Sequence, residues 1–293
     1  MLEKFIRDHI RQLISGSRNP PIAFLTPSGD RGLFGPDSMV WKVHADFISM
    51  IIGGLSSLTL QALHPQALAG VWDHSSFRQD LRGRLERTAF FIAATTYGSV
   101  LMANSAIERV NKIHQHITGI DEFGKPYHAT DPHLLAWVHL TETASFLNAY
   151  QNYRTPKLNA AEQDQYFKEM KILGERLGAV NLPSTAKESK EAIQSYLPEL
   201  YYGQRAQSVV KLLDQFPTHP ATKPFMKLIS KAGFLNLPDW TYPILNEPTP
   251  SLAQRWAVTR SVKLLAIPVR EALKDGVAAH AYRRVYGSHK RKA

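Results

Sequence analysis

Apolar residues recur every three or four positions along most of this 293-residue chain, which is the spacing of helices that bury one face. No run of alternating β-branched residues indicates a strand, and no repeat is visible in the sequence. The pattern therefore predicts an all-α protein built as a single globular domain of several helices. A clear example spans residues 100–117, where one stripe consists of Val100, Ala103, Ile107, Val110, His114 and Ile117.

Capping residues and prolines divide this pattern into helices. Asp37 or Ser38 can cap a helix that runs to about Ala62, and His64-Pro65 ends it because a residue before proline avoids the helical conformation. Further helix starts are indicated at Asp131-Pro132, Asn159 with Glu162, Thr185 with Glu188, and Thr249-Pro250. The last of these predicts a long helix to about Ala272.

Proline and glycine mark the segments between helices. Residues 19–36 are predicted to be a loop that joins an N-terminal amphipathic helix, residues 1–16, to the main body. The domain prediction is thus an N-terminal helix and loop over 1–36 and one helical domain over 37–293. Residues 119–127 are predicted to form a turn-like loop, and residues 217–248 a long surface crossing punctuated by prolines.

Two adjacent glycines, Gly53 and Gly54, interrupt the helix predicted to reach Ala62. Each costs about 1 kcal/mol relative to alanine inside a helix. Such a cost is typical of a close approach, either by another helix or by a flat ligand. The sequence by itself favours simple helix–helix packing.

The composition limits the chemistry that is available. The chain has no cysteine, which excludes disulfides, iron–sulfur clusters, thiolate-bound iron and cysteine nucleophiles. Sequence patterns of zinc peptidases, di-iron bundles, nucleotide-binding loops and serine hydrolases are also missing. Any metal must therefore be held by oxygen ligands or by some of the twelve histidines.

Three histidines and a polar helix start are the candidate functional residues. His114 lies on the apolar stripe, whereas His116 lies on the charged face, and His139 follows on the next predicted helix. A lone histidine on an apolar face is either a core residue or a ligand, and a neutral imidazole is a usual axial ligand of haem iron.

The polar helix start consists of Arg84, Arg87 and Thr88, which share one helix face. One interpretation is a charge cluster with Asp80 and Glu86. The other is a site for an anionic cofactor group such as a haem propionate, because a guanidinium fork suits a carboxylate.

The order and spacing of several short motifs resemble one known family. They are Gly53-Gly54, Leu60-Gln61 with His64-Pro65, Gly70-Val71 with His74-Ser75 and Phe77, Arg84-x-x-x-Thr88, His114 before Gly119, Tyr127-x-Ala129-x-Asp131-Pro132, and Trp137-Val138-His139. Together they are similar to the catalytic domain shared by latex-clearing rubber oxygenases and the mycophenolic-acid pathway oxygenase. The resemblance is carried by residues 41–150.

This resemblance implies a globin-like helical fold that binds haem b and uses molecular oxygen. It implies that His114 is the proximal iron ligand and that Arg84 and Thr88 belong to the pocket. Rubber oxygenases have a lysine where this chain has Arg87, and an arginine is too basic to ligate iron readily. We add Arg87 and His139 to the pocket candidates.

The sequence therefore predicts a haem b-dependent oxygenase that acts on an apolar small molecule, with isoprenoid alkenes as one candidate class. Two alternatives stay open at this point. One is a haem carrier or sensor without turnover, and the other is a basic, membrane-apposed helical protein without a cofactor.

Charge and hydropathy bear on partners and location. The net charge is +10, and residues 255–293 carry +8 of it. A basic end of this kind suggests a polyanion or an anionic membrane surface, but the pattern favours the alternative of a solvated helix and tail, and no motif suggests a nucleic-acid partner. The N-terminal residues lack the apolar core of a secretory signal, and the apolar run 47–63 is short and interrupted by polar residues. We expect a cytoplasmic protein that can attach peripherally to membranes.

Overall fold

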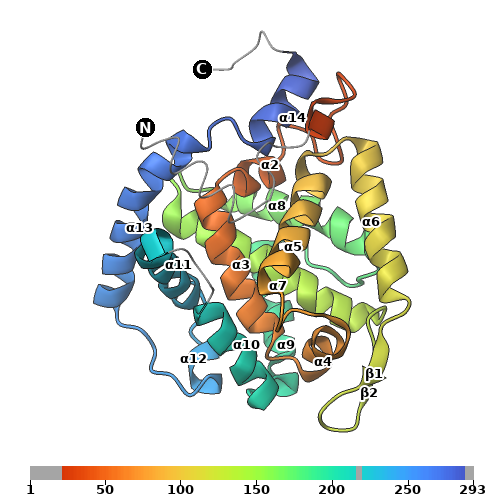
Figure 1. The fold of residues 1–293 in the computed structure, drawn as a ribbon, viewed down its shortest axis with the longest axis vertical. Coiled ribbons are helices and arrows are strands. Elements are labelled where there is room, and N and C mark those ends of the chain that lie inside the picture. Colours follow the sequence, from red (N-terminus) through yellow and green to blue (C-terminus); the bar gives the residue numbers. More distant parts are fainter. Residues whose placement is uncertain (1–21, 216–219, 288–293) are drawn as a thin grey trace.

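The computed structural model describes residues 22–215 and 220–287, and within them it contains thirteen α-helices and one two-stranded sheet (Figure 1). The prediction of an all-α protein is therefore confirmed. The predicted N-terminal helix over residues 1–16 lies outside the described residues. The globin-like arrangement that the resemblance implies stays an expectation.

Two long helices cross at the centre of the fold. These are α3 (Phe47–Gln61) and α7 (Pro132–Tyr153), and most residues of α7 are buried. A β-carbon at Gly53 would come within 2.7 Å of the Phe146 ring and 2.9 Å of the Ser145 carbonyl oxygen. The close approach predicted from the glycine pair is therefore helix–helix packing, and Gly53 is the residue that permits it.

The helix predicted from residue 37 or 38 to about Ala62 is in fact two helices. Ser38 caps α2 (Met39–His44), and Asp46 then caps α3 by accepting a hydrogen bond from the Ser49 amide. The Asp46 carboxylate also receives two hydrogen bonds from Arg270, at 2.6 and 2.9 Å. Burial raises the pKa of Asp46, but the bonds from Arg270 and Ser49 outweigh it and leave the pKa below its ordinary value. The break therefore forms a buried ion pair that holds the C-terminal part of the chain to the core.

Two predicted loops contain regular structure. Residues 217–248 include α11 (Lys223–Leu235), which packs against α3, and the short α12 (Thr241–Ile244). The prediction of a surface crossing was wrong. Pro224 stands in the first turn of α11, where a proline favours a helix. Residues 119–127 belong to a hairpin of β1 (Thr118–Ile120) and β2 (Pro126–His128), whose strands are too short to show alternation.

The remaining helices surround this centre. They are α4 (Pro65–His74), α5 (Leu81–Tyr97), α6 (Val100–His114), α8 (Ala160–Arg176), α9 (Ala186–Ser195), α10 (Gln204–Asp214), α13 (Leu252–Ala272) and α14 (Val277–Tyr286), with 3-10 turns η1 (Ile22–Leu25), η2 (Leu197–Glu199) and η3 (Pro220–Thr222). The capping box of Asn159 and Glu162 at α8 is confirmed. Helix α13 starts two residues after Pro250, with Ser251 and Gln254 as its capping box.

The basic C-terminal end is partly built into the fold. The side chain of Arg284 is 1% exposed and donates hydrogen bonds to the backbone carbonyls of Phe24, Asp30, Tyr97 and Gly98. Arg284 is therefore a structural residue and is not available to an anionic surface. Lys290, Arg291 and Lys292 lie outside the described residues, so attachment to an anionic membrane stays a prediction.

No single helix in the described ranges is long and apolar enough to cross a membrane. Helices α3 and α4 together reach the required length and composition, but they bend by 105° where they meet.

Candidate functional site

Arg84 lies one turn into α5, which begins after the Asp80 cap. The guanidinium is half-buried, and its one hydrogen bond among the described residues goes to the Ser75 hydroxyl at 2.8 Å. Burial lowers the pKa of Arg84, and the positive charge of Arg87 lowers it further. A partly desolvated guanidinium with most of its N–H groups free is suited to a carboxylate ligand.

Arg87 and Thr88 face solvent instead. Arg87 is 61% exposed and lies 3.6 Å from the Asp80 carboxylate. Thr88 is exposed, and its hydroxyl donates to the Arg84 carbonyl at 3.1 Å. The charge-cluster interpretation therefore describes Arg87 and Asp80, while Arg84 stands apart from it.

His114 is the last residue of α6 and is partly buried. Its Nδ1 atom is buried and has no hydrogen-bond partner among the described residues. Burial lowers the pKa of His114, so the imidazole is neutral near pH 7 and can act as a metal ligand. His116 differs as predicted, because it is exposed and its Nδ1 lies 2.8 Å from the Lys112 carbonyl oxygen.

The C-terminal end of α4 brings the Arg84 and His114 regions together. Ser75 bonds Arg84 at the start of α5, and the preceding residue, His74, lies 3.0 Å from the carbonyl oxygen of Thr118. Thr118 is four residues after His114. Helices α5 and α6 also pack along one another.

Apolar side chains on α5 and α6 are left incompletely covered. No residue of α5 from 82 to 93 is buried, although α5 lies between α3 and α6 in Figure 1. Phe90 is 51% exposed, and Val100 and Ile113 on α6 are 46% and 49% exposed. Ile113 directly precedes His114, whereas Val100 lies at the opposite end of α6. Incompletely covered apolar side chains, a free imidazole and a free guanidinium on the same two helices are features that suit a flat, apolar, anionic cofactor such as haem.

His139 is buried on α7 but faces α8. A β-carbon at Gly174 of α8 would lie 2.7 Å from the imidazole, and the Thr143 hydroxyl lies 3.4 Å from Nε2. Burial lowers the pKa of His139 to about 4, so the ring is neutral. The structure does not bring His139 into contact with Arg84 or His114, and its place in the pocket stays a prediction.

The comparison with protein families decides the family of the chain. The family model described as "ER-bound oxygenase mpaB/B'/Rubber oxygenase, catalytic domain" matches residues 41–267, which is most of the sequence. The chain belongs to this family. All five predicted site residues lie within the matched range, and the resemblance predicted from the motifs is confirmed. No curated protein and no solved structure showed significant similarity.

One residue of this oxygenase-family domain was missed by the sequence reasoning. Glu142 has no hydrogen-bond or ion-pair partner among the described residues, and burial raises its pKa to about 7. Phe146, one turn later on the same helix face, packs in a cluster with Phe91 of α5 and Ile107 of α6. The sequence does hold a signal for it, because Glu142 is the single Asp, Glu, Lys or Arg residue in α7.

Replacing Glu142 with glutamine is expected to stabilise the protein at high pH. The ordinary pKa of 4.5 is raised to about 7 on folding, so the folded chain binds more protons between these values. Stability is therefore fully present below about pH 4.5 and is lost as the pH rises through about 7. The side chain keeps some solvent contact, so we expect Glu142→Gln to gain only about 1–2 kcal/mol at about pH 8.

Urea unfolding of wild type and Glu142→Gln at about pH 5 and about pH 8 measures this difference. The exposed Glu191→Gln variant is the matched control and should show no such gain. An equal effect of Glu142→Gln at both pH values would contradict the assignment.

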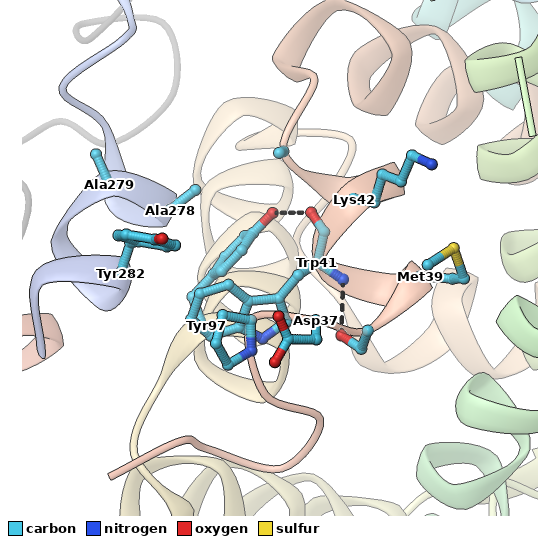
Figure 2. A pocket seen from close by; sticks show the side chains of 11 residues that line it. Asp37, Met39, Trp41, Lys42, Tyr97, Ala278, Ala279 and Tyr282 are labelled. Carbon is cyan, nitrogen blue, oxygen red and sulfur yellow. Dashed lines mark hydrogen bonds between the residues drawn. The ribbon is translucent and has the colours of Figure 1, made fainter. Parts of the chain in front are cut away.

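A separate cavity of about 450 Å³ lies where α2, the end of α5 and α14 meet (Figure 2). Its wall includes Trp41, Lys42, Tyr97 and Tyr282. The Tyr97 hydroxyl donates to the Trp41 carbonyl at 3.0 Å, which fixes the two aromatic rings edge to face. None of the five predicted site residues lines this cavity.

Proposed function

We propose that this oxygenase-family chain is a haem b-dependent oxygenase that uses molecular oxygen on an apolar small molecule. The observation that carries the proposal is the buried Nδ1 of His114, which has no partner among the described residues and lies at the end of a helix with uncovered apolar side chains. A buried polar atom without a partner is costly, and a ligand that uses the imidazole removes that cost.

The residues take different roles in this proposal. His114 would hold the haem iron through its neutral imidazole, and Arg84 would bind a propionate through its free N–H groups. Bound haem would supply the redox-active iron on which oxygen chemistry depends. Arg87 pairs with Asp80, and a guanidinium is a poor iron ligand, so Arg87 is unsuited to cap the iron as a lysine can. Thr88 would stand at the edge of the pocket.

The proposed substrate class follows from apolar side chains that are exposed on the same two helices. Phe90, Val100 and Ile113 leave apolar area on α5 and α6, which favours an apolar substrate, with isoprenoid alkenes as a candidate class. A haem carrier or sensor would share the same residues. Oxygen consumption coupled to product formation separates the oxygenase from that alternative.

Replacing Arg84 with alanine is expected to weaken haem binding or lower the oxidation rate by about 10-fold or more, since one charged hydrogen-bond partner contributes about 1.5–3 kcal/mol. Helicity should be retained, because the substitution removes a single side-chain hydrogen bond, the one to Ser75. The measurement is haem content by pyridine haemochrome together with oxygen uptake.

Arg82→Ala is the matched control, because Arg82 is an exposed arginine on the same helix that pairs with Glu86 at 2.9 Å. It should leave both quantities unchanged. Wild-type haem content and wild-type turnover in Arg84→Ala would show that Arg84 is an ordinary helix-start residue.

A further inference from the structure

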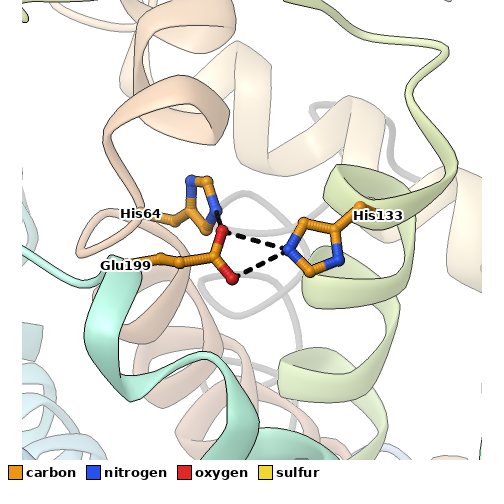
Figure 3. Close-up of side chains that lie close together, drawn as sticks. All are labelled: His64, His133 and Glu199. Atoms are coloured by element: carbon orange, nitrogen blue, oxygen red, sulfur yellow. Dashed lines mark hydrogen bonds and ion pairs between the residues drawn. The ribbon is translucent and has the colours of Figure 1, made fainter.

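Two histidines and a glutamate from distant parts of the chain meet at a second place in the fold (Figure 3). His64 precedes α4, His133 stands in the first turn of α7, and Glu199 ends η2. Glu199 is 135 residues from His64 and 66 residues from His133 along the chain. None of the three belongs to the group around Arg84 and His114.

The ligand atoms converge on one point. His64 Nε2 lies 3.2 Å from Glu199 Oε2, and His133 Nε2 lies 2.9 and 3.0 Å from the two carboxylate oxygens. One ligand atom from each residue lies within 4.8 Å of the other two. A cation placed among the three atoms would need only small side-chain movements to reach the distance of about 2.0–2.2 Å that is found in zinc sites.

Neighbouring side chains hold the histidine rings in place. The Tyr196 ring stacks on His133 at 4.4 Å with an interplanar angle of 20°, and its hydroxyl donates to the His133 carbonyl at 3.0 Å. His64 is 2% exposed and packs beside the Trp137 ring, 6.2 Å away between centroids. Ligands that are oriented before binding lose little conformational freedom when a metal arrives.

The electrostatics also suit a cation. His64 is buried with its Nε2 3.2 Å from the Glu199 carboxylate, and its Nδ1 has no hydrogen-bond partner among the described residues. Burial raises the pKa of Tyr196 to about 12, and the negative charges of Glu199 and Asp131 raise it too. Two carboxylates therefore lie near the cluster, and within the described residues Glu199 pairs with no lysine or arginine.

We propose that His64, His133 and Glu199 bind a divalent transition-metal ion of the zinc class. Two imidazole nitrogens and one carboxylate form a common donor set for such ions, and this set differs from the single histidine that a haem needs. His133 and Glu199 are 51% and 38% exposed, so water completes the coordination shell. The metal joins the starts of α4 and α7 to η2.

Equilibrium dialysis of the full-length protein against Zn²⁺ tests this site, with zinc and iron measured separately. Wild type is expected to bind one zinc ion. His133→Ala and Glu199→Gln should each lower the affinity for zinc at least ~10-fold. His116→Ala is the matched control and should bind as wild type does, because His116 is exposed and lies outside the cluster. The use of two variants keeps the test valid if one of them folds poorly.

Thermal unfolding with and without Zn²⁺ gives an independent readout, because an ion that binds only the folded chain raises the midpoint. The midpoint should rise for wild type and His116→Ala and stay unchanged for the two cluster variants. If all four proteins bind zinc equally, the zinc lies on other residues and the proposal is wrong. If wild type binds no zinc saturably, the cluster is a hydrogen-bond network without metal and the proposal is also wrong.

Discussion

Replacing His114 with alanine is expected to remove nearly all bound haem, whereas replacing His116 should remove none. His114 has a buried ring nitrogen without a partner among the described residues and sits at the end of α6 beside uncovered apolar side chains. His116 is two residues away, exposed, and bonded to its own helix through Lys112. Loss of the proposed iron ligand should lower haem affinity by more than ~10-fold, and oxygen uptake should fall with it.

The measurement is pyridine haemochrome per mole of protein, with the visible spectrum of each variant. Added imidazole provides a further control, because it can enter the space left by the His114 side chain and restore the iron ligand. Direct ligation is supported if added imidazole partly restores the spectrum of His114→Ala and leaves the spectrum of His116→Ala unchanged. Equal haem content in the two variants would contradict the assignment.

The helices around the candidate site could be predicted from sequence because their signals are local. The apolar stripe that includes His114 separated it correctly from His116, and proline and aspartate marked the start of α7. The break between α2 and α3 was missed because Asp46 is stabilised by Arg270, which lies 224 residues away. Helix α11 was missed because the prolines of residues 217–248 indicated a loop, although one of them, Pro224, stands in the first turn of the helix.

Long-range contacts explain what could not be predicted about the candidate sites. Arg84, Arg87 and Thr88 share a helix face in sequence, but the half-burial of Arg84 and the exposure of the other two depend on the neighbouring elements. His139 was grouped with His114 because of its position in the sequence, but its side chain packs against α8. The cluster of His64, His133 and Glu199 comes from three elements far apart in the chain, and no local pattern joins them.

Replacing Gly53 with alanine is expected to destabilise the protein, while the same change at the adjacent Gly54 should stabilise it. A β-carbon at Gly53 would meet the Phe146 Cα and the Ser145 carbonyl oxygen, each at 2.9 Å. These are backbone atoms of α7 that no side-chain rotation can move, so α3 and α7 must separate. Overpacking of this kind costs about 2–3 kcal/mol.

At Gly54 the nearest atom to an added β-carbon belongs to the Phe146 ring and lies 3.9 Å away, which is ordinary van der Waals contact. Gly54→Ala should therefore gain up to about 1 kcal/mol from helix propensity alone. The two variants differ by one position in the same helix, so each is the other's control in urea unfolding of the full-length protein. Helix packing at Gly53 leaves room for a β-carbon at Gly54. If both variants were destabilised equally, packing would not be the explanation, and the two glycines would be needed for a ligand or for the flexibility of α3.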